Sequence, residues 1–180
     1  MELADDLYTN DEKRLSAYEQ GATAASKAME LQDSNAQAHF LYAANLGSAA
    51  RIRGLTTAAM KVKELQRHVA RAIELDSNHA QALQLMGGLF MELPWFLGGD
   101  KKLAQEYLER AVAADGNFTN ALLLLAKSYM RQARNEEARK QLERVIHAEH
   151  PHYPYTWARR FKPEAERLLK ELPMSRPIAK

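Results

Sequence analysis

The sequence contains no cysteine, and this absence excludes disulfides, thiolate nucleophiles and cysteine-based metal sites together. It also lacks any stretch near the roughly 20 apolar residues that a membrane-spanning helix needs, so no membrane span is expected. Neither sign of charge dominates, because 25 Lys and Arg oppose 23 Asp and Glu. A protein that neutralises nucleic-acid phosphates needs a denser basic face, so no nucleic-acid partner is expected. The length of 180 residues fits one domain.

Recognisable catalytic motifs are absent as well. Gly98 and Gly99 are not followed by the Lys-Ser/Thr pair that a phosphate-binding loop requires. Serines occur on predicted helices without the strand–turn–helix elbow that exposes a catalytic serine. The acidic residues lie mostly on polar helix faces, where they are solvated. The sequence therefore predicts a protein that is not an enzyme and that uses no cofactor.

Three histidines, His147, His150 and His152, lie close together near the C-terminus, and imidazoles at such spacing could ligate Zn²⁺ or Cu²⁺. Pro151 and Pro154 interrupt the segment, however, and Glu149 is the only carboxylate nearby. No metal site is predicted. The aromatic residues of this segment are expected to cover the end of the molecule instead.

Internal repetition is the main positive signal. Ala28, Ala72, Ala111 and Val145 each end an amphipathic helical pattern before a short polar turn, at spacings of 44, 39 and 34 residues. Two of the copies read AIELDSNHAQALQLMGGLF and AVAADGNFTNALLLLAKSYM. Apolar residues recur at helical spacing in every copy, which excludes strands. Each copy is therefore predicted to be a pair of helices.

A small residue occupies the middle of the first helix of each pair: Ala43, Gly87 or Ala126, between larger apolar residues. Close crossing of two antiparallel helices requires a small side chain at the contact. From about Gly21 to His150 the chain resembles the tetratricopeptide-repeat (TPR) family. The resemblance implies an all-α fold, a right-handed superhelical stack of antiparallel helix pairs with N- and C-terminal capping helices.

The predicted domain spans residues 11–172. The first helix is expected near residues 12–31, the repeats near 36–77, 80–116 and 119–150, and the capping helix at 162–172, with Pro163 in its first turn. Residues 1–10 and 173–180 are expected to be flexible. The length beyond 34 residues is expected to lie between the two helices of a pair, around residues 51–61 in the first repeat and at LPWFLGG in the second.

The restart GGDKKLAQEYLERA also resembles a narrower group, the TPR-fold T component of periplasmic TRAP transporters and related proteins that include the regulators of microtubule dynamics. This resemblance implies a lipid-anchored or periplasmic scaffold that associates with a solute-binding protein, although no lipidated cysteine supports an anchor. The polar start MELADDLYTND is typical of a mature terminus behind an added Met. A periplasmic or exported location is therefore favoured over a cytoplasmic one.

Trp95, Phe96 and Leu97 lie in the connection LPWFLGG, where Pro94 ends one helix and Asp100 is a good N-cap for the next. We expect the three apolar side chains to fold back onto the ends of their own two helices. The alternative is that they line a ligand entrance or a subunit contact, because exposed apolar clusters are costly unless they are used.

The first helices of the pairs are expected to line a concave groove. The repeat register places these residues on it: Gln37, Phe40, Ala44, Ser48, Gln81, Gln84, Gly88, Met91, Glu92, Asn120, Leu123, Lys127, Met130 and Arg131. The groove is largely uncharged, so the sequence predicts a non-enzymatic scaffold that binds a partner protein or peptide. An accessory of a periplasmic transporter is one such scaffold that the narrower resemblance suggests. The alternatives are a carrier or sensor of an apolar small molecule, and a groove filled by the C-terminal segment of the chain itself.

Overall fold

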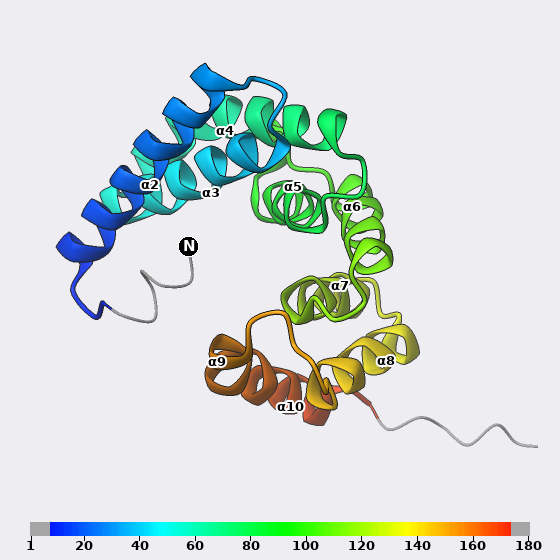
Figure 1. Cartoon of the computed structure of the whole chain (residues 1–180). Helices are drawn as coiled ribbons and strands as arrows, with labels where there is room; N and C mark the ends of the chain where they lie inside the picture. The colour runs from blue at the N-terminus through cyan, green and yellow to red at the C-terminus, as the bar shows by residue number, and fades with distance from the viewer. Residues whose placement is uncertain (1–7, 174–180) are drawn as a thin grey trace, which may run out of the picture.

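The computed structural model describes residues 8–173, and within them the chain forms helices and no strand (Figure 1). This confirms the all-α fold. The ends that were expected to be flexible lie mostly outside the described residues. The helices, in chain order, are α2 (Asp11–Leu31), α3 (Ala36–Arg53), α4 (Leu55–Leu75), α5 (Ala80–Glu92), η1 (Trp95–Leu97), α6 (Lys101–Ala114), α7 (Thr119–Arg131), α8 (Asn135–Ile146), α9 (Pro154–Thr156), η2 (Trp157–Phe161) and α10 (Lys162–Glu171).

Three antiparallel pairs, α3 with α4, α5 with α6 and α7 with α8, follow one another along an arc. The first helix of each pair lies on the inner side of the arc and the second on the outer side (Figure 1). Helix α2 packs along α3 at one end, and α10 packs on α8 at the other. Within residues 8–173, no helix is both long and apolar enough to cross a membrane.

The core lies between the helices of each pair and between neighbouring pairs. Ala43 and Ala126 are fully buried, as expected for small residues at helix crossings. A Cβ atom placed on Gly87 would lie 2.8 Å from Leu108 Cγ, so α5 and α6 approach too closely at this point for a larger residue. Each crossing therefore depends on a small residue, with large apolar side chains on either side.

The first helix pair gains its extra length differently from the expectation. Residues 51–61 are helical except for Gly54, which joins α3 to α4 at a φ of 113°. Glycine adopts this positive φ without steric cost. The insertion therefore extends both helices and forms no loop between them.

The C-terminal helix α10 spans Lys162–Glu171 and has Pro163 in its first turn. Helical backbone leads into α10 without a break from Pro154, through α9 and η2. Proline cannot donate the usual i→i−4 hydrogen bond. The chain accommodates it with a π turn at η2, in which the Lys162 N–H donates to the Trp157 carbonyl. The segment continues the stack: Lys127 of α7 forms an ion pair with Glu164 at 2.8 Å.

The prediction that Trp95, Phe96 and Leu97 fold back was wrong. Their side chains are 85%, 67% and 38% exposed. The turn is held by backbone hydrogen bonds from Gly99 N–H to the Pro94 carbonyl and from Asp100 N–H to the Phe90 carbonyl. The space between the ends of α5 and α6 is filled instead by Phe90, stacked on Tyr107 at 5.6 Å.

Candidate functional site

The residues predicted to line the groove divide into two groups. Phe40, Ala44, Met91 and Leu123 are at most 9% exposed, so they are core residues that a partner cannot reach. They belong to the apolar clusters between the helices, so in this structure they do not line an open surface. The other predicted groove residues are partly or fully exposed on the inner helices: Gln37, Ser48, Gln81, Gln84, Gly88, Glu92, Asn120, Lys127, Met130 and Arg131.

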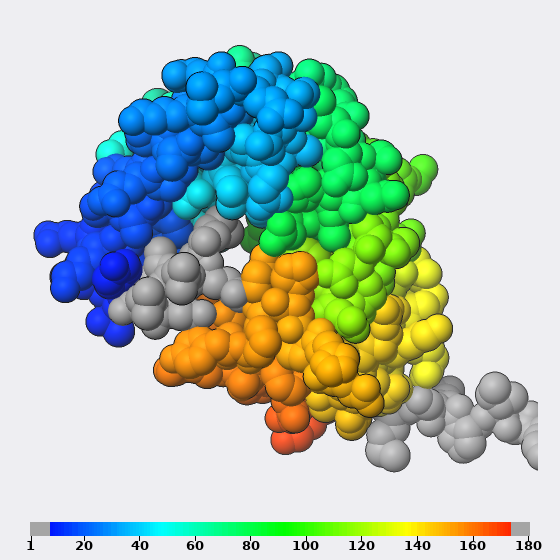
Figure 2. Space-filling view, viewed as in Figure 1, coloured from blue at the N-terminus to red at the C-terminus, as the bar shows by residue number. Residues whose placement is uncertain are grey.

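A polar cleft of about 580 Å³ opens where α3 and α5 begin. Its walls come from two turns and the helix starts that follow them, residues 32–37 leading into α3 and residues 76–81 leading into α5, together with His152. Figure 2 shows the inner side of the arc hollowed where the light-blue, green and orange segments approach one another. Carboxamide side chains dominate the lining: Gln32, Asn35, Gln37, Asn78 and Gln81. Carboxamides both donate and accept hydrogen bonds, as a peptide backbone does.

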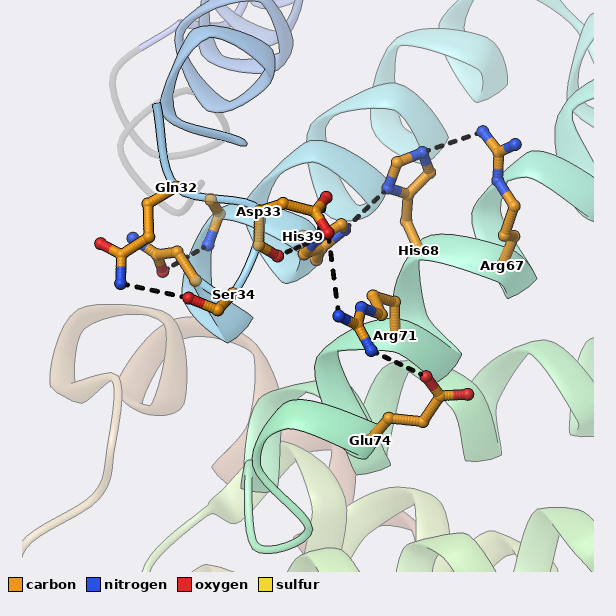
Figure 3. Close-up of polar contacts among 10 residues, drawn as sticks. Gln32, Asp33, Ser34, His39, Arg67, His68, Arg71 and Glu74 are labelled. Atoms are coloured by element: carbon orange, nitrogen blue, oxygen red, sulfur yellow. Dashed lines mark hydrogen bonds and ion pairs between the residues drawn. The ribbon is translucent and has the colours of Figure 1, made fainter. Parts of the chain in front are cut away.

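The first wall is anchored to α4 by a chain of hydrogen bonds through two histidines (Figure 3). His39 Nε2 lies 2.9 Å from the Asp33 carbonyl, which can only accept, so Nε2 carries the proton. His39 Nδ1 is then the acceptor for His68 Nδ1–H at 3.0 Å. His68 Nε2 in turn accepts from the Arg67 guanidinium at 3.2 Å. The chain requires both imidazoles to be neutral.

The electrostatics around His68 agree with this neutral state. Burial, together with the neighbouring charge of Arg67, lowers the pKa of His68 below its ordinary value of 6.5. Arg71 of α4 lies 3.7 Å from the Asp33 carboxylate and 3.3 Å from Glu74 (Figure 3), and these contacts hold the turn from its outer side. The first wall is therefore a fixed structure.

The second wall is joined to the first by His79. His79 Nδ1 accepts from the Ala82 N–H at 3.2 Å and so caps α5. His79 Nε2 consequently carries the proton, which it donates to Gln37 Oε1 at 2.9 Å. Burial lowers the pKa of His79, which favours this neutral tautomer. The side-chain N–H groups of Gln37 remain available to the cleft.

Residues 147–153, which we call the strap, cross the inner side of the molecule beside the third turn, residues 115–118 between α6 and α7. His152 Nδ1 donates to Asp115 at 2.6 Å, and the His152 backbone N–H donates to the Asn117 carbonyl at 3.1 Å. The rings of His152 and Tyr153 lie 5.0 and 5.9 Å from that of Phe118. The Gln81 amide bonds to the Tyr153 hydroxyl. Part of the predicted groove is thus occupied by the chain itself.

The three histidines of the C-terminal segment are not brought together. His152 is bound to Asp115, whereas His147 and His150 are exposed. Among residues 8–173 no group of three or more histidine, aspartate or glutamate side chains is placed to hold a metal ion.

Sequence reasoning did not identify His39, His68 or His79 as parts of the site. His39 was recognised only as a large residue of the first inner helix. The Asn and Asp residues of the turns were treated as turn formers. The signal that could have found the cleft is the recurrence of Gln37 and Gln81 as the second residue of two successive inner helices, next to the similar turns DSNAQ and DSNHAQ.

The stack of antiparallel helix pairs with small residues at the crossings defines a tetratricopeptide-repeat protein. A family model described as "Tetratricopeptide repeat" matches residues 99–158. The model described as "Regulator of microtubule dynamics protein 1-3" matches residues 2–95, about half of the chain. The chain belongs to this family of regulators of microtubule dynamics.

Among its relatives, regulator of microtubule dynamics protein 1 is 30% identical in Pongo abelii and in Homo sapiens, and 28% identical in Mus musculus. Each alignment covers 68% of this chain but only 44–45% of the relative. The chain therefore spans less than half the length of the curated relatives it matches.

Two crystal structures of MamA show the same fold. One has a TM-score of 0.56 at 16% identity and covers 91% of this chain and 93% of that one. The other has a TM-score of 0.55 at 17% identity, with coverages of 95% and 91%. The family match over residues 2–95 supports the resemblance to the regulators of microtubule dynamics, and the resemblance to the transporter component stays a prediction.

Proposed function

We propose that this chain is a non-enzymatic scaffold that binds an extended segment of a partner protein in the polar cleft between the first and second turns. The observation that carries the proposal is the set of carboxamides that two fixed turns hold around one open space. An extended peptide has unpaired backbone N–H and C=O groups, which such side chains can satisfy. The cleft volume of about 580 Å³ suits a segment of a few residues.

The alternative of an apolar small-molecule carrier is less well supported. Such a carrier needs a pocket lined mainly by hydrophobic and aromatic side chains. Of the large apolar residues predicted for the groove, Phe40, Met91 and Leu123 are buried between helices, and Met130 alone is partly exposed. The cleft that is open has mostly polar walls. A peptide therefore fits this site better than an apolar ligand.

The identity of the partner goes beyond what the relatives can supply. Their name links them to microtubule dynamics, but this chain spans less than half of their length. We therefore propose a scaffold role for this chain and propose no microtubule target. An accessory role beside a periplasmic transporter also stays a prediction, and cell fractionation with identification of the neighbouring genes would test it.

The scaffold proposal is tested by selecting peptides from a displayed random library on the immobilised full chain. Peptides that bind in the cleft should lose binding to Gln37→Leu and to Asn78→Ala. They should keep binding to Gln20→Leu, which makes the same chemical change on the exposed face of α2. Circular dichroism confirms that each variant is folded. The proposal fails if no peptide is enriched, or if the enriched peptides bind both cleft variants as well as the wild type.

A further inference from the structure

The second and third turns of the molecule are built alike. In the second turn, Asp76 Oδ1 accepts from the Asn78 N–H at 3.0 Å. In the third, Asp115 Oδ1 accepts from the Asn117 N–H at 2.9 Å. Each aspartate is therefore held by its own turn and presents its second carboxylate oxygen in an equivalent position.

The same two turns are attached to the outer helices in the same way. Arg110 of α6 donates to the Ser77 carbonyl at 3.3 Å, and Arg144 of α8 donates to the Gly116 carbonyl at 3.2 Å. A repeat protein places equivalent surfaces side by side along its axis. The space beside one turn is therefore the structural equivalent of the space beside the next.

These two equivalent spaces differ in whether they are filled. Beside the third turn, the strap is bound by Asp115 and by the amide of Gln81. Beside the second turn, the corresponding residues are Asp76 and Gln37, and both line the open cleft. Gln37 and Gln81 correspond because each is the second residue of its inner helix.

The open space offers the same hydrogen-bonding atoms as the filled one. Gln81 uses its Nε2 to bond the Tyr153 hydroxyl. Gln37 accepts from His79 through its Oε1, so its Nε2 is the atom left to donate a hydrogen bond, as the Nε2 of Gln81 does. His79 also takes the place of Phe118 at the N-cap of the inner helix, and it forms part of the cleft wall.

We propose that the open cleft binds a partner segment with the same pair of side chains as the strap: a histidine that donates to Asp76, followed directly by a tyrosine whose hydroxyl bonds Gln37. This inference rests on the proposed scaffold function and names the chemistry of the partner. In the strap, Tyr153 precedes Pro154 and has an extended φ of −130°. A residue before proline is biased toward extended backbone, so a His-Tyr-Pro sequence matches the site best.

The test uses a synthetic, fluorescently labelled peptide with the sequence of residues 148–156, AEHPHYPYT, added to the full-length chain. Fluorescence anisotropy should show saturable binding. Asp76→Asn should weaken it about tenfold, because the charge is lost while the asparagine oxygen can still hold the turn. Gln37→Leu, and the peptide changes corresponding to His152→Ala and Tyr153→Phe, should each weaken it to a similar extent.

The matched control is Asp115→Asn in the protein. This variant weakens the hydrogen bond that holds His152 of the strap but leaves Asp76 and Gln37 unchanged, so it should not reduce binding of the peptide. Absence of binding to the wild-type chain would overturn the inference. So would binding that responds to Asp115→Asn and not to Asp76→Asn, because the peptide would then replace the strap. If the library selection yields peptides that depend on the cleft but lack the His-Tyr pair, the scaffold proposal stands and this inference is wrong.

Discussion

Two adjacent glycines of α5 should respond in opposite directions to the same substitution. A Cβ atom on Gly87 would lie 2.8 Å from Leu108 Cγ and 3.0 Å from the Ala104 carbonyl oxygen. A Cβ atom on Gly88 would find nothing closer than Gln84 Nε2 at 3.8 Å and Leu124 Cδ1 at 3.9 Å, which are ordinary contacts. Gly87 faces the partner helix of its own pair, and Gly88 has room for a methyl group.

The expected magnitudes follow from two opposing effects. Replacing glycine by alanine inside a helix favours folding by about 1 kcal/mol at either position. At Gly87 this gain is opposed by overpacking of about 2–3 kcal/mol, the upper part of the usual range, because a backbone oxygen can move only if α6 moves with it. Gly87→Ala should therefore lower the free energy of unfolding by about 1–2 kcal/mol, and Gly88→Ala should raise it by about 0.5–1 kcal/mol.

Urea unfolding followed by circular dichroism separates the two outcomes. With a slope of about 2 kcal/mol per molar urea, the midpoints of the two variants should differ by about 1 M, and the wild type should lie between them. Unchanged slopes would show that the comparison concerns the folded state. If both substitutions stabilise the chain, or if Gly88→Ala is the more damaging one, the close approach of α5 and α6 at Gly87 is wrong.

Two further predictions concern the His68 chain and the exposed turn. Acid should destabilise the fold. Burial keeps the pKa of His68 below 6.5, so below that pH the unfolded chain takes up the proton first, and stability present above it is lost as the pH falls toward the lowered pKa. Urea unfolding at about pH 7.5 and about pH 5.5 should show a smaller loss in His68→Asn than in the wild type, and an equal loss would refute the assignment. Trp95→Ser should change the free energy of unfolding by less than about 1 kcal/mol, because the side chain is 85% exposed. If the same urea assay gave a loss of about 3 kcal/mol in the free energy of unfolding, Trp95 would behave as a buried Trp and the prediction would be wrong.

The fold could be predicted from the sequence because its determinants are local. Apolar spacing marked each helix, and Asp100 indicated the start of α6, where its carboxylate accepts from the N–H groups of Lys102 and Leu103. The small residues at the helix crossings identified which face of each inner helix meets its partner. These features depend on residues within one repeat, so a single sequence is sufficient to find them.

The groove was harder to predict because its lining depends on the distance between repeats. Helical periodicity places Gln37 and Phe40 on the inner half of α3 alike. Phe40 is buried because α5 packs against that side and brings the His79 ring to within 5.1 Å of it. Gln37, nearer the start of the helix, stays at the edge of the packed region. How far this packing extends along each inner helix is a property of the assembled stack.

The strap shows a second limit of local reasoning. Its hydrogen bonds join Tyr153 to Gln81 and His152 to Asp115, which are 72 and 37 positions away. Loop closure over such distances leaves no periodic pattern in the sequence. Yet the second and third turns carry the same aspartate and asparagine in the same positions, and only one of them is covered. The difference between a filled and an open site therefore arises from the length of chain between α8 and α9, which reaches the third turn and ends there, and not from the turn sequences themselves.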